Sequence, residues 1–218
     1  MFQGFSPETV DFLWGIRMNN NRAWFEANKQ AYNQFLYNPM KELGAAVYGA
    51  LGDLPETELK VSRIYRDARM HPPVPYKESL WFCVRRAGAY WAQNPTLYFE
   101  IRPEGASFGF SLWEPGTETM EAFRRSLMAR PEDFPSLLEE AQARSGLTLV
   151  PECYKRPRPC DNPAIGPYFQ WRRHLDATRE LLPGEELFSP ELPELVAGTL
   201  RPWLPVCRYL DRLITAAL

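Results

Sequence analysis

The sequence has few of the residues that build metal sites, redox centres or disulfide frameworks. Its 218 residues include two histidines and four cysteines. Neither histidine belongs to a zinc-binding pattern, and no two cysteines stand in a Cys-x-x-Cys arrangement. Free cysteine is among the most buried residue types, so we expect structural thiols. The sequence gives no reason to expect a metal ion or an organic cofactor.

Long apolar runs and an excess of basic charge are also absent. The longest stretch without a charged residue, 87–99, has 13 residues, whereas a membrane span needs about 20 mostly apolar residues. The first residues lack the basic and apolar segments of a signal peptide. A net charge of −2 and a pI near 5.8 argue against a dedicated nucleic-acid-binding protein. We expect a cytoplasmic protein without a membrane segment. Contact with a nucleic-acid backbone is the weakest of the alternatives considered, and a steep salt dependence would reveal it.

The common signatures of catalysis and phosphate binding are missing or lack their structural context. Neither G-x-x-x-x-G-K-[ST] nor G-x-G-x-x-G occurs. Residues 105–109 match the G-x-S-x-G pattern of serine hydrolases, which requires a strand, a sharp turn and a helix. Here the pattern runs from a hairpin loop into an alternating strand, so we interpret the match as coincidental. Whether the protein is an enzyme stays open.

What the sequence does contain is the composition of an ordinary globular domain, expected to span 1–218. Hydrophobic residues make up 45 % and charged residues 24 %. The Ser-Pro-Glu segment 6–8 predicts a helix start. Asn21 is expected to cap a second helix, and the Asn-Pro pair 38–39 to open a third. The first fifty residues are therefore predicted to be helical.

Strand patterns dominate the middle of the chain. Residues 80–84 form a short apolar run, while 97–102 and 107–113 alternate between apolar and polar residues. A four-residue loop would join the last two segments into a hairpin. Pairing Arg102 with Ser107 places the apolar residues of both strands on one face.

The rest of the chain is predicted to return to helix. Two helices follow the hairpin, the second of them over 131–146, and residues 147–150 suit a short edge strand. A last helix begins near Ser189 and should be kinked or split by Pro202 and Pro205.

The predicted fold is α+β, with a mainly antiparallel sheet that includes the hairpin 97–102/107–113. N-terminal, middle and C-terminal helices pack with this sheet. Proline-rich segments at 71–75 and 151–167 predict extended connections. The segment 168–182 fits a helix as well as it fits a strand.

The polar face of the hairpin has an uneven surface. Large residues on one strand stand opposite small ones on the other, namely Tyr98, Glu100 and Arg102 against Ser111, Gly109 and Ser107. Room beside fixed polar groups is a common beginning of a ligand groove. The alternative is an ordinary solvated sheet face.

Four tryptophans could supply flat surfaces for a base or a sugar, and these are Trp24, Trp81, Trp91 and Trp113. Aromatic residues at helix or strand spacing are more often part of the core. The sequence leaves both interpretations open.

The segment 60–90 is locally basic, with seven basic residues against two acidic ones. Over the whole chain arginine outnumbers lysine 20 to 5, and guanidinium groups form bidentate pairs with carboxylate or phosphate. The residues that would hold an anionic group are Arg63, Arg66, Arg69 and Lys77. Asp67 would orient the arginines or act as a base. The alternative is an internal ion-pair network with Asp67, Glu78 and Glu100.

Four motifs follow one another along the chain. The first consists of Asn20, Asn21, Trp24 and Phe25, the second of residues 62–70 with 75–77, the third of 108–115 and the fourth of 161–163. In this order they resemble the domain-of-unknown-function family 2461, from Phe5 to about Trp171. The resemblance implies a single α+β domain and a central cluster of Arg63, Arg66, Asp67, Arg69, Tyr76 and Lys77. It brings no activity, cofactor or substrate. The chain departs from the family pattern between Arg69 and Pro75 and at Asn162.

We expect the protein to bind a small anionic ligand, a phosphate or a carboxylate, over the polar face of the sheet. The residues expected at this site are Arg63, Arg66, Asp67, Arg69, Tyr76, Lys77, Tyr98, Glu100 and Arg102. The alternative is a non-catalytic scaffold or partner-binding module whose arginines form structural ion pairs. Arg66→Ala should abolish binding in the first case and lower stability sharply in the second. The oligomeric state stays open.

Overall fold

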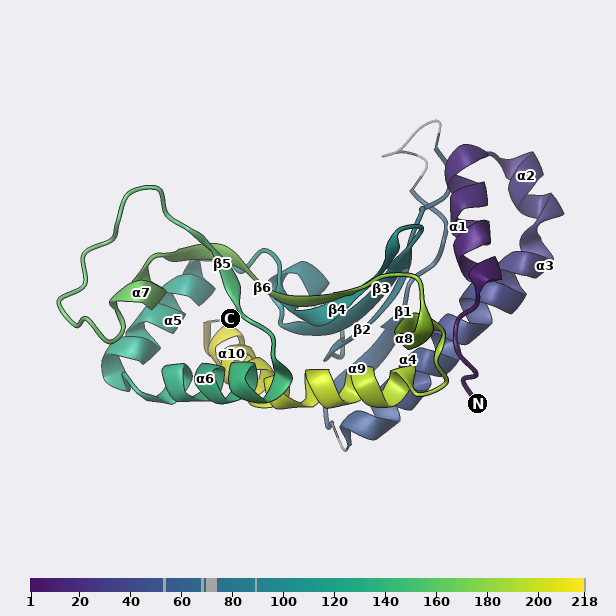
Figure 1. Ribbon diagram of the computed structural model, residues 1–218. Helices are drawn as coiled ribbons and strands as arrows, with labels where there is room; N and C mark the ends of the chain where they lie inside the picture. Colours follow the sequence, from purple (N-terminus) through teal and green to yellow (C-terminus); the bar gives the residue numbers. More distant parts are fainter. Residues whose placement is uncertain (53, 68, 70–73, 89, 218) are drawn as a thin grey trace.

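An antiparallel sheet with helices packed against one of its faces forms the centre of the protein (Figure 1). The computed structural model describes residues 1–52, 54–67, 69, 74–88 and 90–217, apart from the side chains of residues 91 and 217. The extended connector predicted at 71–75 therefore lies largely outside the described residues. The α+β class predicted from the sequence is confirmed.

Within the described part of the chain the sheet has six strands in the order β1-β2-β3-β4-β6-β5, with all neighbours antiparallel. A row of phenylalanines crosses its core face, because Phe99 stacks on Phe82 and on Phe108 with ring centroids 5.7 and 6.1 Å apart. The strands are β1 (Thr57–Val61), β2 (Leu80–Arg86), β3 (Thr96–Arg102), β4 (Gly105–Leu112), β5 (Val150–Cys153) and β6 (Trp171–Leu181).

The helices cover the core face of the sheet, where α4 packs on β1 and β2 and α9 packs on β4. Trp203 is fully buried and stacks on Phe110, with ring centroids 5.0 Å apart. No helix in the described ranges is both long enough and apolar enough for a membrane crossing. The helices are α1 (Pro7–Met18), α2 (Arg22–Ala27), α3 (Lys29–Ala31), α4 (Asn38–Leu51), α5 (Thr117–Ala129), α6 (Asp133–Ser145), α7 (Gly166–Phe169), α8 (Glu185–Phe188), α9 (Leu192–Leu200) and α10 (Leu204–Ala217).

The predicted hairpin is present, but the predicted pairing of Arg102 with Ser107 is wrong by two residues. Arg102 pairs with Gly105, because the turn consists of residues 103–104 alone. Gly105 has a φ of +143°, and a Cβ atom there would stand 2.1 Å from the carbonyl oxygen of Leu181, so the position requires glycine. A shift of two residues keeps every side chain on its face. The predicted division into a polar and an apolar face is therefore confirmed.

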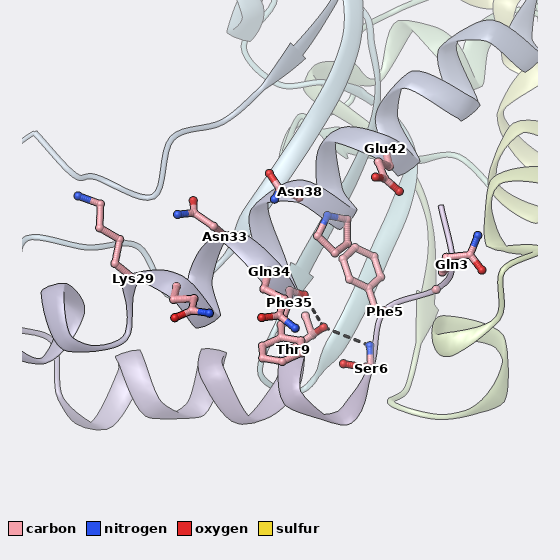
Figure 2. Close-up of a pocket in the computed structure, with 13 residues that line it drawn as sticks. Gln3, Phe5, Ser6, Thr9, Lys29, Asn33, Gln34, Phe35, Asn38 and Glu42 are labelled. Atoms are coloured by element: carbon pink, nitrogen blue, oxygen red, sulfur yellow. Dashed lines mark hydrogen bonds between the residues drawn. The ribbon is translucent and has the colours of Figure 1, made fainter. Parts of the chain in front are cut away.

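The N-terminal region is helical as predicted, but the prediction that a new helix starts at Asn38 is wrong. Asn38 has helical dihedral angles, and a π-helical segment (Tyr32–Tyr37) runs directly into α4. Pro39 has no N–H group to donate to the carbonyl of Phe35. The buried Thr9 hydroxyl donates to that oxygen instead, at 2.6 Å (Figure 2). The helix therefore passes the proline with this carbonyl satisfied.

Replacing Thr9 with valine is expected to lower the free energy of unfolding by about 1–3 kcal/mol, because the Phe35 carbonyl loses its donor while the side-chain shape is kept. Thermal unfolding of Thr9→Val and Thr9→Ser measures the effect, since serine retains the hydroxyl. Equal melting temperatures for Thr9→Val and the wild-type protein would contradict this role.

The segment 168–182, whose sequence fits a helix as well as a strand, is mainly a strand in the structure. Residues 171–181 form β6, which lies between β4 and β5 in the sheet. The edge strand β5 is present but begins at Val150, the last of the residues predicted for it. The last helix is split as predicted, because α9 ends at Leu200 and a 3₁₀ turn that contains Pro202 separates it from α10.

Candidate ligand site on the polar face of the sheet

A cavity of about 700 Å³ lies on the polar face of the sheet, opposite the face that the helices cover. It extends over β2, β3, β4 and β6, because alternate residues of each strand point to the same side. We call it the sheet-face cavity. The residues that line it are Lys77, Trp81, Cys83, Thr96, Tyr98, Glu100, Arg102, Ser107, Ser111, Trp113, His174, Asp176, Thr178 and Glu180.

A chain of hydrogen bonds crosses the floor of this cavity. Tyr98, Gly109 and Thr178 stand side by side on three strands. Since Gly109 has no side chain, the Tyr98 hydroxyl reaches across it to the Thr178 hydroxyl, at 2.8 Å. Thr178 gives its only proton to the Asp176 carboxylate, so Tyr98 is the donor to Thr178. Burial raises the pKa of Tyr98 to about 12, and the phenol therefore keeps its proton at neutral pH.

The charged groups of the floor are partly paired with one another. Arg102 Nη2 donates to both carboxylate oxygens of Glu180, at 2.9 and 3.0 Å. The Glu100 carboxylate has no hydrogen bond or ion pair within the described residues, although its charge acts on Lys77. In that same part of the chain no three His, Cys, Asp or Glu side chains come together to hold a metal ion. Arg102 is thus engaged inside the protein, whereas Glu100 is available to a ligand.

Lys77 reaches the same cavity from the segment that precedes β2. Its ammonium lies 5.6 Å from the centroid of the Trp81 ring, and no carboxylate of the described residues comes within 4.0 Å of it. Burial lowers the pKa of Lys77, as do the positive charges of Arg66 and Arg63, while Glu100 acts in the opposite direction. Lys77 is therefore a half-buried cation without an ion-pair partner in the described chain.

Tyr76, the residue before Lys77, is held by three hydrogen bonds from distant parts of the sequence. The Asn20 carboxamide accepts from the Tyr76 N–H and donates to the Tyr76 carbonyl, each at 3.0 Å. Arg66 Nε donates to the same carbonyl at 2.8 Å. These bonds fix the point at which the lysine side chain enters the cavity.

Four of the nine residues expected at the site line the cavity, namely Lys77, Tyr98, Glu100 and Arg102. Arg63 and Arg66 lie outside the lining, but their charges act on the Lys77 ammonium. Arg66 contributes a structural hydrogen bond in addition.

The other three expected residues are placed elsewhere. Tyr76 is buried, and its ring stacks on Phe25 with ring centroids 4.3 Å apart. Asp67 and Arg69 form an exposed ion pair with each other, at 2.7 Å. The structure thus does not bring these three side chains to the sheet-face cavity.

Residues of β6 complete the cavity and were missed in the sequence, namely His174, Asp176, Thr178 and Glu180. Their alternation with Leu175, Ala177 and Leu181 is the signal that could have found them. The charged Arg179 interrupts the apolar half of this pattern, and the register shifts between β5 and β6 disturb its beginning.

The tryptophans considered for stacking divide into two groups. Trp81 and Trp113 line the cavity, and Trp113 is 48 % exposed. Trp24 packs against Phe12 instead, with ring centroids 5.5 Å apart. The side chain of Trp91 lies outside the described residues.

A second hollow, of about 920 Å³, lies between the N-terminal segment and the π-helical turn (Figure 2). Its charged residues, Lys29 and Glu42, stand at opposite ends of the view, so they do not converge on one ligand group. Most of its polar groups are neutral carboxamides, from Gln3, Gln30, Asn33, Gln34 and Asn38. We therefore place the candidate site in the sheet-face cavity.

A third cavity, of about 510 Å³, contains a carboxyl oxygen without a hydrogen bond in the described residues. Asp211 Oδ1 is buried and has no hydrogen bond within the described residues. Burial raises the pKa of Asp211 to about 6, although the charge of Arg86 lowers it. Arg208 and Arg212 line the same cavity.

Asp211→Asn is expected to raise the melting temperature at pH 8 and to change it little at pH 4. The pKa of Asp211 is higher in the folded chain than the value of about 3.9 expected when unfolded. The resulting stability is complete below about pH 4 and is lost as the pH rises through about 6. Asparagine stays neutral at every pH and removes this loss.

Thermal unfolding between pH 4 and pH 8 measures the effect of Asp211→Asn. The exposed Asp161 gives a matched control, because Asp161→Asn makes the same chemical change at the surface. An identical pH dependence in Asp211→Asn and the wild-type protein would show that Asp211 does not titrate as described.

The fold and the sheet-face cavity define an α+β protein in which the polar face of an antiparallel sheet carries a cavity of the size of small-molecule sites. The model of the family described as "Conserved hypothetical protein (DUF2461)" matches residues 8–209. The chain belongs to this family, as the order of its motifs predicts. No curated protein matches the chain. Two of the motif residues support the segment that carries Lys77, since Asn20 binds the main chain of Tyr76 and Phe25 stacks on its ring.

Proposed function

We propose that the protein binds a small molecule with a phosphate or carboxylate group in the sheet-face cavity, with this group at Lys77. One observation carries the proposal, which is that the half-buried Lys77 ammonium has no carboxylate within 4.0 Å among the described residues. Charges taken out of water in proteins are normally paired. The anionic group of a ligand would supply the missing partner.

The surroundings of Lys77 support this proposal. Burial and the charges of Arg66 and Arg63 lower the pKa of Lys77, and the opposing charge of Glu100 does not cancel them, so the positive charge is disfavoured. A bound anion would pair with Lys77 and reduce its repulsion from both arginines. Anion binding should therefore raise the pKa of Lys77.

The alternative function is a scaffold or partner-binding module in which the arginines serve the fold. Arg17 favours it, because its guanidinium pairs with Glu78 at 2.7 Å and also with Glu104. These contacts tie α1 to the segment before β2 and to the hairpin turn. In this alternative no small anion stabilises the protein.

We also propose that the protein works in the cytoplasm. Its four cysteines are free, as is usual in a reducing compartment. Burial raises the pKa of Cys83 to about 11, so this thiol stays protonated and unreactive at neutral pH.

A thermal-shift series tests the anion site. The probes are inorganic phosphate, pyrophosphate, glucose 6-phosphate, citrate and ATP, each compared with sodium chloride of equal ionic strength. A ligand at one hundred times its Kd stabilises the folded state by about 2.7 kcal/mol, which corresponds to a rise of about 5–10 °C for a chain of this size. Melting temperatures that follow ionic strength alone, for every probe, would contradict the proposal.

Arg66→Ala is expected to lower the free energy of unfolding by about 1.5–3 kcal/mol, because a charge-assisted hydrogen bond to the Tyr76 carbonyl is lost. The exposed Arg63 gives a matched control, since Arg63→Ala removes the same charge and should change stability by less than about 0.5 kcal/mol. Thermal unfolding compares the two variants. Since this bond belongs to the fold in either function, a loss of stability in Arg66→Ala does not separate ligand binding from the scaffold alternative. Wild-type stability in Arg66→Ala would contradict the structural role of Arg66.

A further inference from the structure

One end of the sheet-face cavity is formed by Trp113 and His174. Trp113 follows the last residue of β4 and leaves 48 % of its surface exposed. The His174 ring stands at 87° to it, with ring centroids 4.4 Å apart. Both side chains line the cavity, so this end offers an indole surface beside a ring that can donate or accept a hydrogen bond.

The backbone of β6 is distorted at this point. His174 has a φ of +47°, in the left-handed region that residues other than glycine rarely adopt. It is an extra residue in the pairing with β5, because Pro151 pairs with Leu175 while Glu152 pairs with Arg173. Bulges of this kind redirect side chains, and here the redirected side chain is the imidazole beside Trp113.

The floor between the two ends of the cavity offers several charged or phenolic hydrogen-bond acceptors beside the hydroxyl groups of Ser107 and Ser111. Tyr98 gives its proton to Thr178, so its oxygen can only accept from a ligand. Asp176 uses one oxygen for Thr178, and its other oxygen has no partner in the described chain. The Glu100 carboxylate has no hydrogen-bond partner there either. A ligand that lies on this floor must therefore bring several donors.

The acceptors are spread along the cavity rather than gathered at one point. Asp176 of β6 pairs with Ser111 of β4, which in turn pairs with Thr96 of β3. Glu100 lies four residues after Thr96 on β3. Four residues of a strand span about 13 Å. Hydroxyl groups around sugar rings match such a distribution, whereas the amino group of a base or an amine would meet only one of these acceptors.

We propose that the ligand of the sheet-face cavity is a sugar with a phosphate or carboxylate group, of about disaccharide size. This inference rests on the proposed anion site at Lys77. The sugar hydroxyls donate to Asp176, Tyr98 and Glu100, and the C–H face of one ring lies on Trp113. The size follows from the distance between the acceptors, because Asp176 and Glu100 are about 13 Å apart along the sheet, farther than a single sugar ring reaches.

Isothermal titration tests the inference with six probes, which are inorganic phosphate, glucose 6-phosphate, trehalose 6-phosphate, trehalose, ATP and phosphoethanolamine. The disaccharide phosphate is expected to bind at least tenfold more tightly than inorganic phosphate. Trp113→Ala should remove this gain and leave the affinity for inorganic phosphate unchanged, whereas Trp113→Phe, which keeps a flat ring, should restore most of it. Trp14→Ala is the matched control, because Trp14 is 39 % exposed on α1 and does not line the cavity.

The outcomes separate this inference from the proposed function. Equal affinities for phosphate and both sugar phosphates, all dependent on Lys77, would overturn the sugar class and leave the anion site intact. Tighter binding of ATP or phosphoethanolamine than of trehalose 6-phosphate would overturn it as well. A gain that survives in Trp113→Ala would overturn the role of Trp113. If neither phosphate nor any sugar phosphate binds, the proposed function itself fails.

Discussion

Lys77→Gln is expected to weaken the binding of phosphate-bearing ligands about 10- to 100-fold, because a charge-assisted hydrogen bond to the anion is lost. The same substitution should not lower the melting temperature. Burial and two neighbouring arginines disfavour the Lys77 charge in the folded protein, so a neutral side chain of similar length is tolerated at least as well. Loss of binding without loss of stability is the signature of a ligand site.

Lys41 provides a close control for this variant. Its ammonium also lies 5.6 Å from the centre of an aromatic ring, that of Tyr37, but it is on the exposed side of α4 and outside the cavity. Lys41→Gln therefore makes the same change in net charge and removes a similar contact. Titration calorimetry with inorganic phosphate and trehalose 6-phosphate compares the two. Equal weakening in both variants would mean that the anions respond to net charge alone.

Gly109→Ala is expected to lower the free energy of unfolding by about 1–3 kcal/mol or more, because the backbone of β6 has no room for a side chain there. A Cβ atom at this position would stand 1.9 Å from the carbonyl oxygen of Ala177 and 3.0 Å from the Cα atom of Thr178. Separation of β4 from β6 would also stretch the hydrogen bond between Tyr98 and Thr178. Ligand affinity should therefore fall together with stability.

Gly49→Ala is the matched control for the glycine variant. Gly49 lies in α4, where an added Cβ atom would meet nothing within 4 Å, and alanine in a helix is expected to stabilise by about 0.5–1 kcal/mol. Chemical denaturation measures both changes. A Gly109→Ala protein as stable as wild type would show that β6 can move away from β4 without cost, and that Gly109 does not fix the cavity floor.

The position of the candidate cavity follows from a pattern that the sequence displays. Strict alternation in β3 and β4 assigns large polar residues to one face, and a period of two makes this assignment independent of the register error. The turn itself was predicted wrongly, because two residues close it and Gly105 takes up the sharp bend. The polar face could thus be predicted from local sequence alone.

The rest of the site depends on contacts between distant segments. Arg66 stands in a basic stretch, but one of its hydrogen bonds is to the Tyr76 carbonyl, and no periodicity reveals a side-chain bond to the main chain. Asp67 and Arg69 are two residues apart and pair with each other. Charge content therefore located the segment of Lys77, but it did not separate the lysine that enters the cavity from the ion pair that remains on the surface.

The helix start predicted at Asn38 is also wrong because of a contact between distant segments. An Asn-Pro pair is a valid local signal for a helix start, and the signal is overridden because Thr9 supplies a donor to the Phe35 carbonyl. Thr9 is 26 residues away from Phe35. A tertiary hydrogen bond of this kind cannot be inferred from the local pattern.

Nuclear magnetic resonance of the lysine side chains tests the central claim most directly. The chain has five lysines, so the Cε signals of protein labelled with ¹³C-lysine can be assigned with single Lys→Arg variants. Addition of inorganic phosphate or trehalose 6-phosphate is expected to shift the signal of Lys77 alone and to move its titration midpoint to higher pH. A Lys77 signal that does not change while the ligand is bound, or equal shifts for all five lysines, would contradict an anion site at this residue.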